Sequence, residues 1–353
     1  MLSRARIASI ATALSIAAAV TVLGQGSSTP APAAAGGPAG ATARIVTSAQ
    51  ALANTLDGPA RAKLQYPADS PQKTRWSNLP SGIFQRTGLR LGDVTAPQRA
   101  AIMALLATAL SREGYQKVVA IMRGDEVLRT QGDGRGGGRG GRGPAFGQDE
   151  YYLAFVGTPS VTDPWMLQFG GHHLAINLTL AGREATLAPS LPAAQPASYT
   201  FEGRTVRPLG RENDKAFELI QALTSTQRSQ AILSHQVSDL VLGPDADGRT
   251  IQPEGIRASA LTPAQQAILL DIVREWVGIM HDAFAAPRMA DIRAALPETW
   301  FAWSGPTTSG SAAYFRIQGP TLVIEYAPQG GVDHIHTIYR DPTNDYGVKF
   351  ARR

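Results

Sequence analysis

The chain has 353 residues, a formal net charge of +5 and no cysteine, with 43% apolar and 17% charged residues. This composition is typical of a globular protein, and the length is sufficient to bury a substantial core. Without cysteine there is no disulfide, no thiolate metal site and no cysteine nucleophile. Any metal ion must therefore be held by histidine, carboxylate or carbonyl groups.

The positive charge is concentrated in two segments of low complexity. Arg4 and Arg6 lie near the N-terminus, and Arg135, Arg139 and Arg142 lie in a glycine-rich run that has a single acid. Without these two segments the net charge is about +1, which is too small for the basic surface that nucleic-acid-binding domains carry. We therefore expect no nucleic-acid partner.

The first 26 residues have the pattern of a secretory signal peptide, with two arginines, an apolar run from Ile7 to Leu23 and small polar residues after it. The run is rich in alanine and only weakly hydrophobic, so we expect no stable membrane span after cleavage. Residues 27–42 are rich in alanine, proline and glycine and predict a flexible tether. We expect residues 43–353 to form a single domain in the periplasm or outside the cell.

That domain is predicted to be α+β and to consist of two related halves, about 45–190 and 212–350. Thr95 and Thr262 each open an apolar helix pattern, and each is followed three residues later by a glutamine, at an offset of 167. This spacing is that of a capping box at a helix N-terminus. We expect helices followed by a β-hairpin or meander in each half, packed about a pseudo-twofold axis as one body. Chance similarity between common patterns is the alternative.

The first half carries a Gly/Arg-rich insertion, residues 131–148. Further along, residues 166–178 align with residues 314–326 at an offset of only 148, because the insertion lengthens the first half. The glycines of the insertion satisfy a dinucleotide-binding pattern, but the strand and helix that give this pattern its meaning are missing around it. We interpret the insertion as a low-complexity surface loop, and we expect no organic cofactor.

Four of the six histidines fall in two related places and provide the clearest functional signal. His334 and His336 are one residue apart in a run that alternates like a strand, which puts both imidazoles on one face, about 7 Å apart at Cα. His172 and His173 lie in the related stretch of the first half. Neither pair aligns with histidine in the other half. This difference is expected if one composite site lies between the halves.

We therefore expect a site formed by the strands His172–Thr179 and Asp333–Arg340. One interpretation is a divalent metal or copper ion bound by histidines. A second is a metal-free polar pocket whose histidines act as general acids and bases or bind a sugar. A third has the histidines in the core or at a strand edge, with no site. The candidate metal ligands are His172, His173, His334 and His336.

The second histidine pair is flanked by an arginine and acids that are candidates for catalysis. In the functional interpretation, the arginine binds an anion and the acids transfer protons or support a histidine. In the alternative, these are turn acids that cap their own backbone, with the arginine paired to one of them. The candidate catalytic residues are Glu325, Arg340, Asp341 and Asp345.

The leading hypothesis is a metal-assisted hydrolase that acts on an extracytoplasmic small molecule or glycan. Four aromatic residues near the expected site suggest a glycan, although aromatic residues on strands more often belong to the core. The alternative is a non-catalytic periplasmic protein that holds a metal ion or small ligand. An enzyme needs an open coordination position, whereas a carrier site is closed by protein ligands. The four aromatic residues are Trp165, Trp300, Trp303 and Tyr314.

Three stretches carry a resemblance to a known family. Phe169–Thr179, Tyr314–Tyr326 and Asp333–Pro342 are similar to the bacterial family known as domain of unknown function 3500. The similarity extends over most of the expected mature chain, from about Leu52 to Gly347. The resemblance implies no reaction and no residue roles, so every functional expectation above depends on the residues alone.

Overall fold

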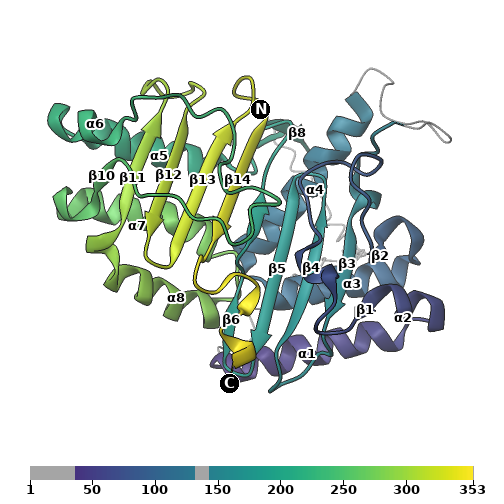
Figure 1. Cartoon of the computed structure of the whole chain (residues 1–353). Coiled ribbons are helices and arrows are strands. Elements are labelled where there is room, and N and C mark those ends of the chain that lie inside the picture. The colour runs from purple at the N-terminus through teal and green to yellow at the C-terminus, as the bar shows by residue number, and fades with distance from the viewer. Residues whose placement is uncertain (1–35, 132–142, 353) are drawn as a thin grey trace, which may run out of the picture. The chain divides into compact units, whose positions relative to one another are not determined.

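A large, mostly antiparallel sheet forms the framework of the protein (Figure 1). The computed structural model describes residues 36–131 and 143–352, and contacts gather Gly36–Arg353 into one unit. The strands are β1 (Gln65–Tyr66), β2 (Leu89–Arg90), β3 (Tyr152–Val156), β4 (Trp165–Gly171), β5 (Leu174–Ala181), β6 (Glu184–Thr186), β7 (Ser190–Pro192), β8 (Tyr199–Phe201), β9 (Arg204–Val206), β10 (Ile256–Arg257), β11 (Trp300–Ser304), β12 (Tyr314–Gly319), β13 (Leu322–Pro328) and β14 (Ile335–Arg340).

Twelve of these strands belong to the one sheet, and β8 and β9 form a separate hairpin. The main order is β1-β3-β4-β5-β7-β14-β13-β12-β11-β10, with β2 paired to β3 and β6 paired to β5. The short strand β7 therefore joins a meander of the first half to a meander of the second. The expected α+β class is confirmed. The pseudo-twofold relation between the halves remains a prediction.

The helices begin where the sequence provides caps. Thr95 and Thr262 form the predicted capping boxes with Gln98 and Gln265. Each threonine hydroxyl accepts a hydrogen bond from the glutamine backbone N–H, and each glutamine side-chain oxygen accepts one from the threonine backbone N–H. The helices in the described residues are α1 (Pro38–Asn54), α2 (Gly58–Leu64), α3 (Ala96–Ala109), α4 (Arg112–Gln131), α5 (Gly210–Ala222), α6 (Ser225–Ala231), α7 (Pro263–Val277) and α8 (Asp282–Ala294).

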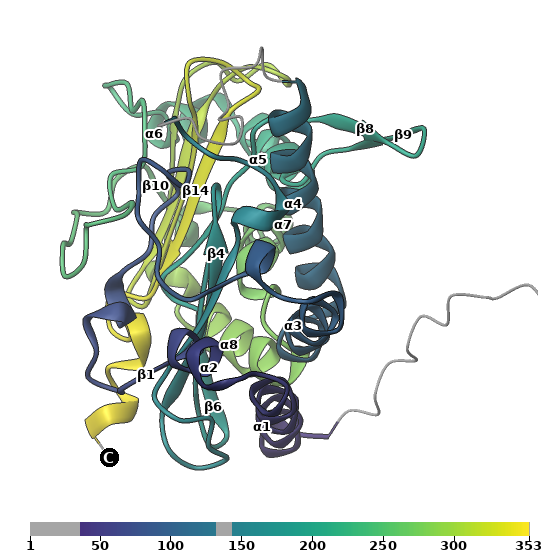
Figure 2. The ribbon, with the colours of Figure 1, turned by 90° about the vertical axis from the view of Figure 1, so that its right-hand side faces the viewer.

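The two faces of the sheet differ in chemistry. One face is apolar, with residues such as Ile176, Ile317 and Ile324, and it packs with the helices into the main core. Figure 2 shows the sheet nearly edge-on, with most helices on one side and extended loops on the other. The loop-covered face carries buried polar side chains that need hydrogen-bond partners. These include Gln168, Asn177, Arg316, Glu325, His336 and Arg340.

The first helix begins earlier than the composition predicts. The tether was expected to extend to residue 42, yet α1 starts at Pro38, and Ala41 and Thr42 are already buried. Proline is well suited to the first helical turn, and the Thr42 hydroxyl donates a hydrogen bond to the Gly182 carbonyl at 2.6 Å. Packing against the sheet thus overrides the tether-like composition of residues 38–42. The predicted signal peptide and residues 27–35 lie outside the described residues.

None of the helices in residues 36–131 and 143–352 is both long and apolar enough to cross a membrane.

Candidate metal centre

The two histidine pairs lie at one edge of the sheet. Strands β5 and β14 both pair antiparallel with β7, so they run in the same direction and their first residues lie at the same edge (Figure 1). His173 directly precedes β5, and His334 directly precedes β14. Between them, Ala193 donates its N–H to the carbonyl of His173 at 2.9 Å.

His172 and His173 form the turn between β4 and β5, which corrects the expected strand His172–Thr179. Gly171 and Leu174 pair directly, so the two histidines occupy a two-residue connection. His173 has φ of 61°, in the left-handed region, which costs a non-glycine residue about 1–2 kcal/mol. This strained backbone holds the His173 ring against the second pair. In contrast, the predicted shared face of His336 and Arg340 on β14 is confirmed by the strand register.

Three of the four histidines converge. The Nε2 atom of His334 lies 2.9 Å from Nε2 of His173 and 2.9 Å from Nε2 of His336. In the described part of the chain, these three form a group whose ligand atoms all lie within 4.8 Å of one another. An ion with tetrahedral angles and bonds of about 2.0–2.1 Å would separate its ligand nitrogens by about 3.3 Å. Small side-chain movements are therefore sufficient to hold an ion.

Asp239 determines which nitrogen of His336 carries the proton. Its Oδ1 lies 3.1 Å from Nδ1 of His336 and also accepts a hydrogen bond from the N–H of Leu240. Although burial acts to raise it, these hydrogen bonds hold the pKa of Asp239 below its ordinary value. The ionised carboxylate only accepts, so Nδ1 of His336 carries the proton and Nε2 presents a lone pair.

The converging nitrogens have too few protons to satisfy one another. Nε2 of His336 has only a lone pair, and Nε2 of neutral His334 has at most one proton for its two contacts. If Nε2 of His334 donates its proton to His336, it has no lone pair to accept a hydrogen bond from His173. If it carries no proton, it faces the lone pair of His336. A cation at the centre of the three lone pairs removes this conflict. These three histidines could therefore hold a metal ion.

Burial keeps two of these imidazoles neutral. Burial of the ring, together with the nearby His172, His334 and His336, holds the pKa of His173 well below its ordinary value. Burial, His336 and His172 lower the pKa of His334 to about 4. Neutral imidazole is the form that binds metal ions. At neutral pH both rings are therefore in the protonation state that can bind a metal ion.

The lowered pKa values predict a pH dependence for the ion-free protein. In the unfolded chain His334 titrates near the ordinary pKa of about 6.5, whereas in the folded protein it titrates at about 4. The unfolded chain therefore takes up protons first, and the free energy of unfolding should fall as pH drops from about 6.5 to about 4. Urea unfolding of the chelator-treated protein measures this loss.

Replacing His334 by glutamine provides the control for that experiment, because glutamine does not titrate. The variant should lose less stability than the wild type between the same two pH values. Equal losses in both proteins would contradict the assignment of this pH dependence to His334.

His172 does not join the converging group, contrary to its place among the expected ligands. Its Nδ1 lies 2.6 Å from Oδ1 of Asp125, both side chains are buried, and its ring lies against that of His173 with centroids 3.6 Å apart. Asp125 also accepts the N–H of Gly147 at 2.9 Å, and Phe146 contacts the His172 ring edge-on at 4.9 Å. His172 is therefore a packing partner of His173 in this structure.

The same contacts revise the expected insertion. Residues 132–142 lie outside the described residues, but Ala145 pairs with Ser81, and Phe146 and Gly147 pack beside His172. The end of the segment assigned as a surface loop is thus fixed at the candidate site. The edge-on contact of the half-buried Phe146 with His172 shows that the last residues of this segment are not a free surface loop.

Glu325 anchors a loop. Its two oxygens accept the N–H groups of Val241 and Leu242, each at 2.8 Å, and the Tyr314 hydroxyl donates to it at 2.8 Å. Burial raises the pKa of the Glu325 carboxyl in spite of these donors. All its hydrogen bonds described here go to the loop and to Tyr314, none to the histidines. The loop that it holds is the one that carries Asp239.

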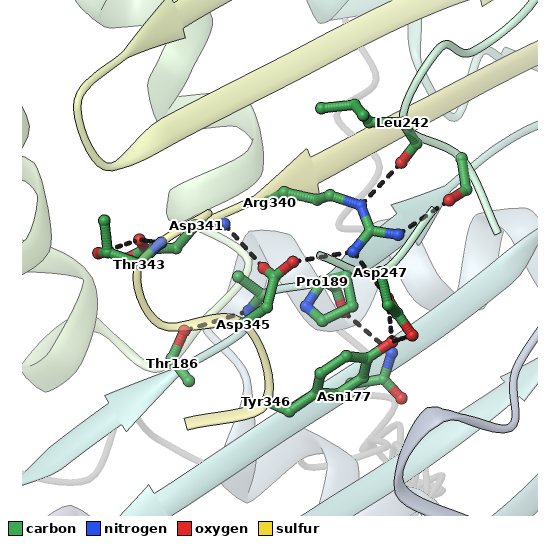
Figure 3. Close-up of polar contacts among 12 residues, drawn as sticks. Asn177, Thr186, Pro189, Leu242, Asp247, Arg340, Asp341, Thr343, Asp345 and Tyr346 are labelled. Atoms are coloured by element: carbon green, nitrogen blue, oxygen red, sulfur yellow. Dashed lines mark hydrogen bonds and ion pairs between the residues drawn. The ribbon is translucent and has the colours of Figure 1, made fainter. Parts of the chain in front are cut away.

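Arg340 joins three parts of the chain (Figure 3). Its Nη1 contacts Asp247 at 2.9 Å and Asp345 at 2.8 Å, while Nε and Nη2 donate to the carbonyls of Leu242 and Gly243. Its guanidinium carbon also lies 5.9 Å from the ring centroid of Trp76. Every guanidinium nitrogen is engaged within the protein. This supports the structural alternative over an anion-binding arginine.

The two aspartates of the turn also bond within it. Asp345 accepts the N–H of Asp341 at 2.9 Å, and Asp341 accepts the N–H and hydroxyl of Thr343 at 3.0 and 2.7 Å (Figure 3). Arg288 forms an ion pair with Asp341 at 3.2 Å. The structure thus places Arg340, Asp341 and Asp345 together in a network of their own. No hydrogen bond between them and the three histidines occurs among the described residues.

The aromatic residues that suggested a glycan belong mainly to the interior. Trp165, Trp303 and Tyr314 are at most 2% exposed, and Trp300 contacts Arg257. Strand residues with large rings pack into the cores on the two faces of the sheet. Trp165, Trp303 and Tyr314 therefore supply no exposed platform for a sugar.

Asp239, Asn78 and Asp125 were not identified from the sequence. Asp239 and Asn78 lie in loops without periodicity, 97 and 258 residues away from His336. Asp125 lies within the pattern of helix α4, where an acid normally predicts a solvated face. Only the folded arrangement brings these residues to the histidines.

No curated protein and no solved structure matches the chain. Residues 39–348 match the family described as "Protein of unknown function (DUF3500)". This match covers most of the chain, including all three converging histidines, and agrees with the resemblance seen in the three sequence stretches. The protein therefore belongs to the DUF3500 family.

Proposed function

We propose that His173, His334 and His336 bind one metal ion, and that the protein is a metal-assisted hydrolase. The convergence of their three Nε2 atoms within 4.8 Å carries this proposal. The neutral state of His173 and His334 and the Asp239 hydrogen bond to His336 support it. Carboxylate partners of this kind orient metal-ligating histidines in many proteins.

The ligand chemistry favours zinc or copper over magnesium, calcium or manganese. Imidazole nitrogen suits zinc and copper, whereas the other three ions prefer oxygen ligands. Within the described residues, the converging group contains no carboxylate. The three imidazoles leave the full positive charge of the ion uncompensated. Such an ion can polarise a carbonyl or phosphoryl oxygen or lower the pKa of a water molecule.

The number of ligands favours an enzyme over a carrier. Three protein ligands with an open fourth position are typical of catalytic zinc sites, whereas structural sites are closed by four. Among the described residues, three histidines form the converging group. His334 is only half-buried, so one side of this group is accessible to solvent. A non-catalytic metal-binding protein is the second candidate.

The substrate and its location are also part of the proposal. The signal-like leader supports a periplasmic or secreted protein, and the substrate is then an extracytoplasmic small molecule or glycan. One imidazole comes from the first half and two from the second. This supports a composite site between two halves related by a pseudo-twofold.

The His173→Asn variant tests the ligand set with little effect on folding. Asparagine tolerates the left-handed backbone of residue 173 but removes the imidazole. We expect the variant to fold and its zinc affinity to fall by more than the roughly 100-fold that loss of an outer-shell partner costs. Calorimetric zinc titration of wild type and variant, with thermal unfolding alongside, measures both properties.

The wild type and the His173→Asn variant also test the enzyme proposal. Wild-type protein purified without a histidine tag and loaded with zinc or copper is screened against ester, amide, phosphoester and glycoside substrates. Turnover by the wild type that is lost in His173→Asn supports the hydrolase. Tight metal binding with no turnover on any class favours the binding protein. Unchanged zinc affinity in the variant contradicts the ligand set.

A further inference from the structure

Asn78 is held next to the three converging histidines. Its Nδ2 lies 3.1 Å from Nε2 of His336, and its backbone carbonyl accepts the N–H of His173 at 3.2 Å. The residues on either side are fixed, because Nη2 of Arg86 donates to the carbonyls of Ser77 and Leu79 at 2.7 and 2.5 Å. Asn78 thus contacts both halves of the ligand set and is positioned before any ion binds.

The hydrogen bond of the Asn78 amide must change when an ion binds. Nδ1 of His336 carries the proton that faces Asp239, so in the ion-free protein the amide donates to the lone pair on Nε2. An ion at about 2.0–2.1 Å takes that lone pair. Since Nδ2 lies 3.1 Å from the same nitrogen, it remains within about 5 Å of the ion. An atom in a fourth position on the Asn78 side of the ion would then be within hydrogen-bond reach of the released amide.

We propose that Asn78 donates a hydrogen bond to the oxygen atom of the substrate that occupies the open position of the ion. The inference rests on the proposed metal site. It specifies the substrate as one that presents a negatively charged or polarised oxygen, such as a carboxylate, an ester or amide carbonyl, or a phosphoryl group. Fixed donors directed at such an oxygen stabilise the charge that develops there.

Asp239 offers a matched comparison, because it contacts the other nitrogen of the same imidazole. Asp239 supports the metal-ligating His336, so Asp239→Asn should lower metal affinity by about 10–100-fold. Its loss of affinity for an oxygen-donor ligand, measured on the loaded protein, should be smaller than that of the Asn78 variants. Asn78 contacts the substrate oxygen, so Asn78→Ala should show the reverse pattern. Its metal affinity should stay within about threefold of the wild type, while affinity for an oxygen-donor ligand falls about 10–100-fold.

Cobalt-substituted protein measures both affinities by visible absorption. Cobalt is titrated first, and acetohydroxamate, an oxygen-donor probe, is titrated into the loaded protein. Asn78→Leu keeps the side-chain volume without the donor and should behave like Asn78→Ala, which guards against a folding effect of either substitution.

The two failures are distinguishable. If wild-type protein binds no cobalt, the metal site itself is wrong and the inference falls with it. If cobalt and acetohydroxamate both bind the Asn78 variants as they bind the wild type, the metal site stands and the role of Asn78 is wrong. A fall in cobalt affinity as large as in Asp239→Asn would assign Asn78 to the support of the ligands, and would also overturn the inference.

Discussion

Replacing both His334 and His336 by alanine is expected to remove the bound metal ion. The two side chains supply two of the three converging nitrogens, and His173 alone cannot hold an ion. Metal content of the untagged protein, measured by plasma mass spectrometry, should fall from near one equivalent of zinc or copper to background. The loss of affinity should exceed the roughly 100-fold that removal of an outer-shell partner costs.

His235→Ala is the matched control for that loss. His235 is exposed and lies outside the converging group, so its removal should leave the metal content unchanged. Metal retained by the double variant, or lost equally in the control, would contradict the ligand set.

Replacing Arg340 by leucine is expected to lower the free energy of unfolding by about 3–5 kcal/mol, because loss of one partner leaves buried charge uncompensated. The side chain of Arg340 is only 3% exposed and pairs with Asp247 and Asp345. Leucine also removes the hydrogen bonds to Leu242 and Gly243. Urea unfolding monitored by circular dichroism measures the change.

An exposed arginine provides the comparison. Arg207 forms a two-bond pair with Asp214, but the side chains are 43% and 59% exposed, so Arg207→Leu should cost no more than about 1 kcal/mol. The folded Arg340→Leu protein should keep its metal affinity, because Arg340 has no described contact with the three histidines. Normal stability with loss of activity would instead support the anion-binding role first considered for Arg340.

The sequence predicted local features whose cause is local. The capping boxes at Thr95 and Thr262 depend on two residues three positions apart, and the shared face of His336 and Arg340 depends on strand alternation alone. Both predictions concern short spans, within which the backbone geometry determines where side chains point. For the same reason the α+β class was predictable from helix and strand patterns.

The rest of the site depends on contacts between distant segments. Strand β7 brings β5 and β14 together, and no periodicity in the sequence indicates that pairing. Asp239 and Asn78 come from loops whose paths follow from anchors such as the buried Glu325 and the half-buried Arg86. The turn at His172 and His173 was assigned to a strand because alternation does not reveal a two-residue connection that lacks glycine at its tip.

Anomalous diffraction from crystals of the metal-loaded protein, recorded on both sides of the zinc and copper absorption edges, tests the central claim most directly. We predict one peak at about 2.0–2.1 Å from Nε2 of His173, His334 and His336, with a solvent molecule or added ligand in the fourth position. A peak with four protein ligands would contradict the open, catalytic site. The absence of any peak at these three nitrogens would contradict the metal centre.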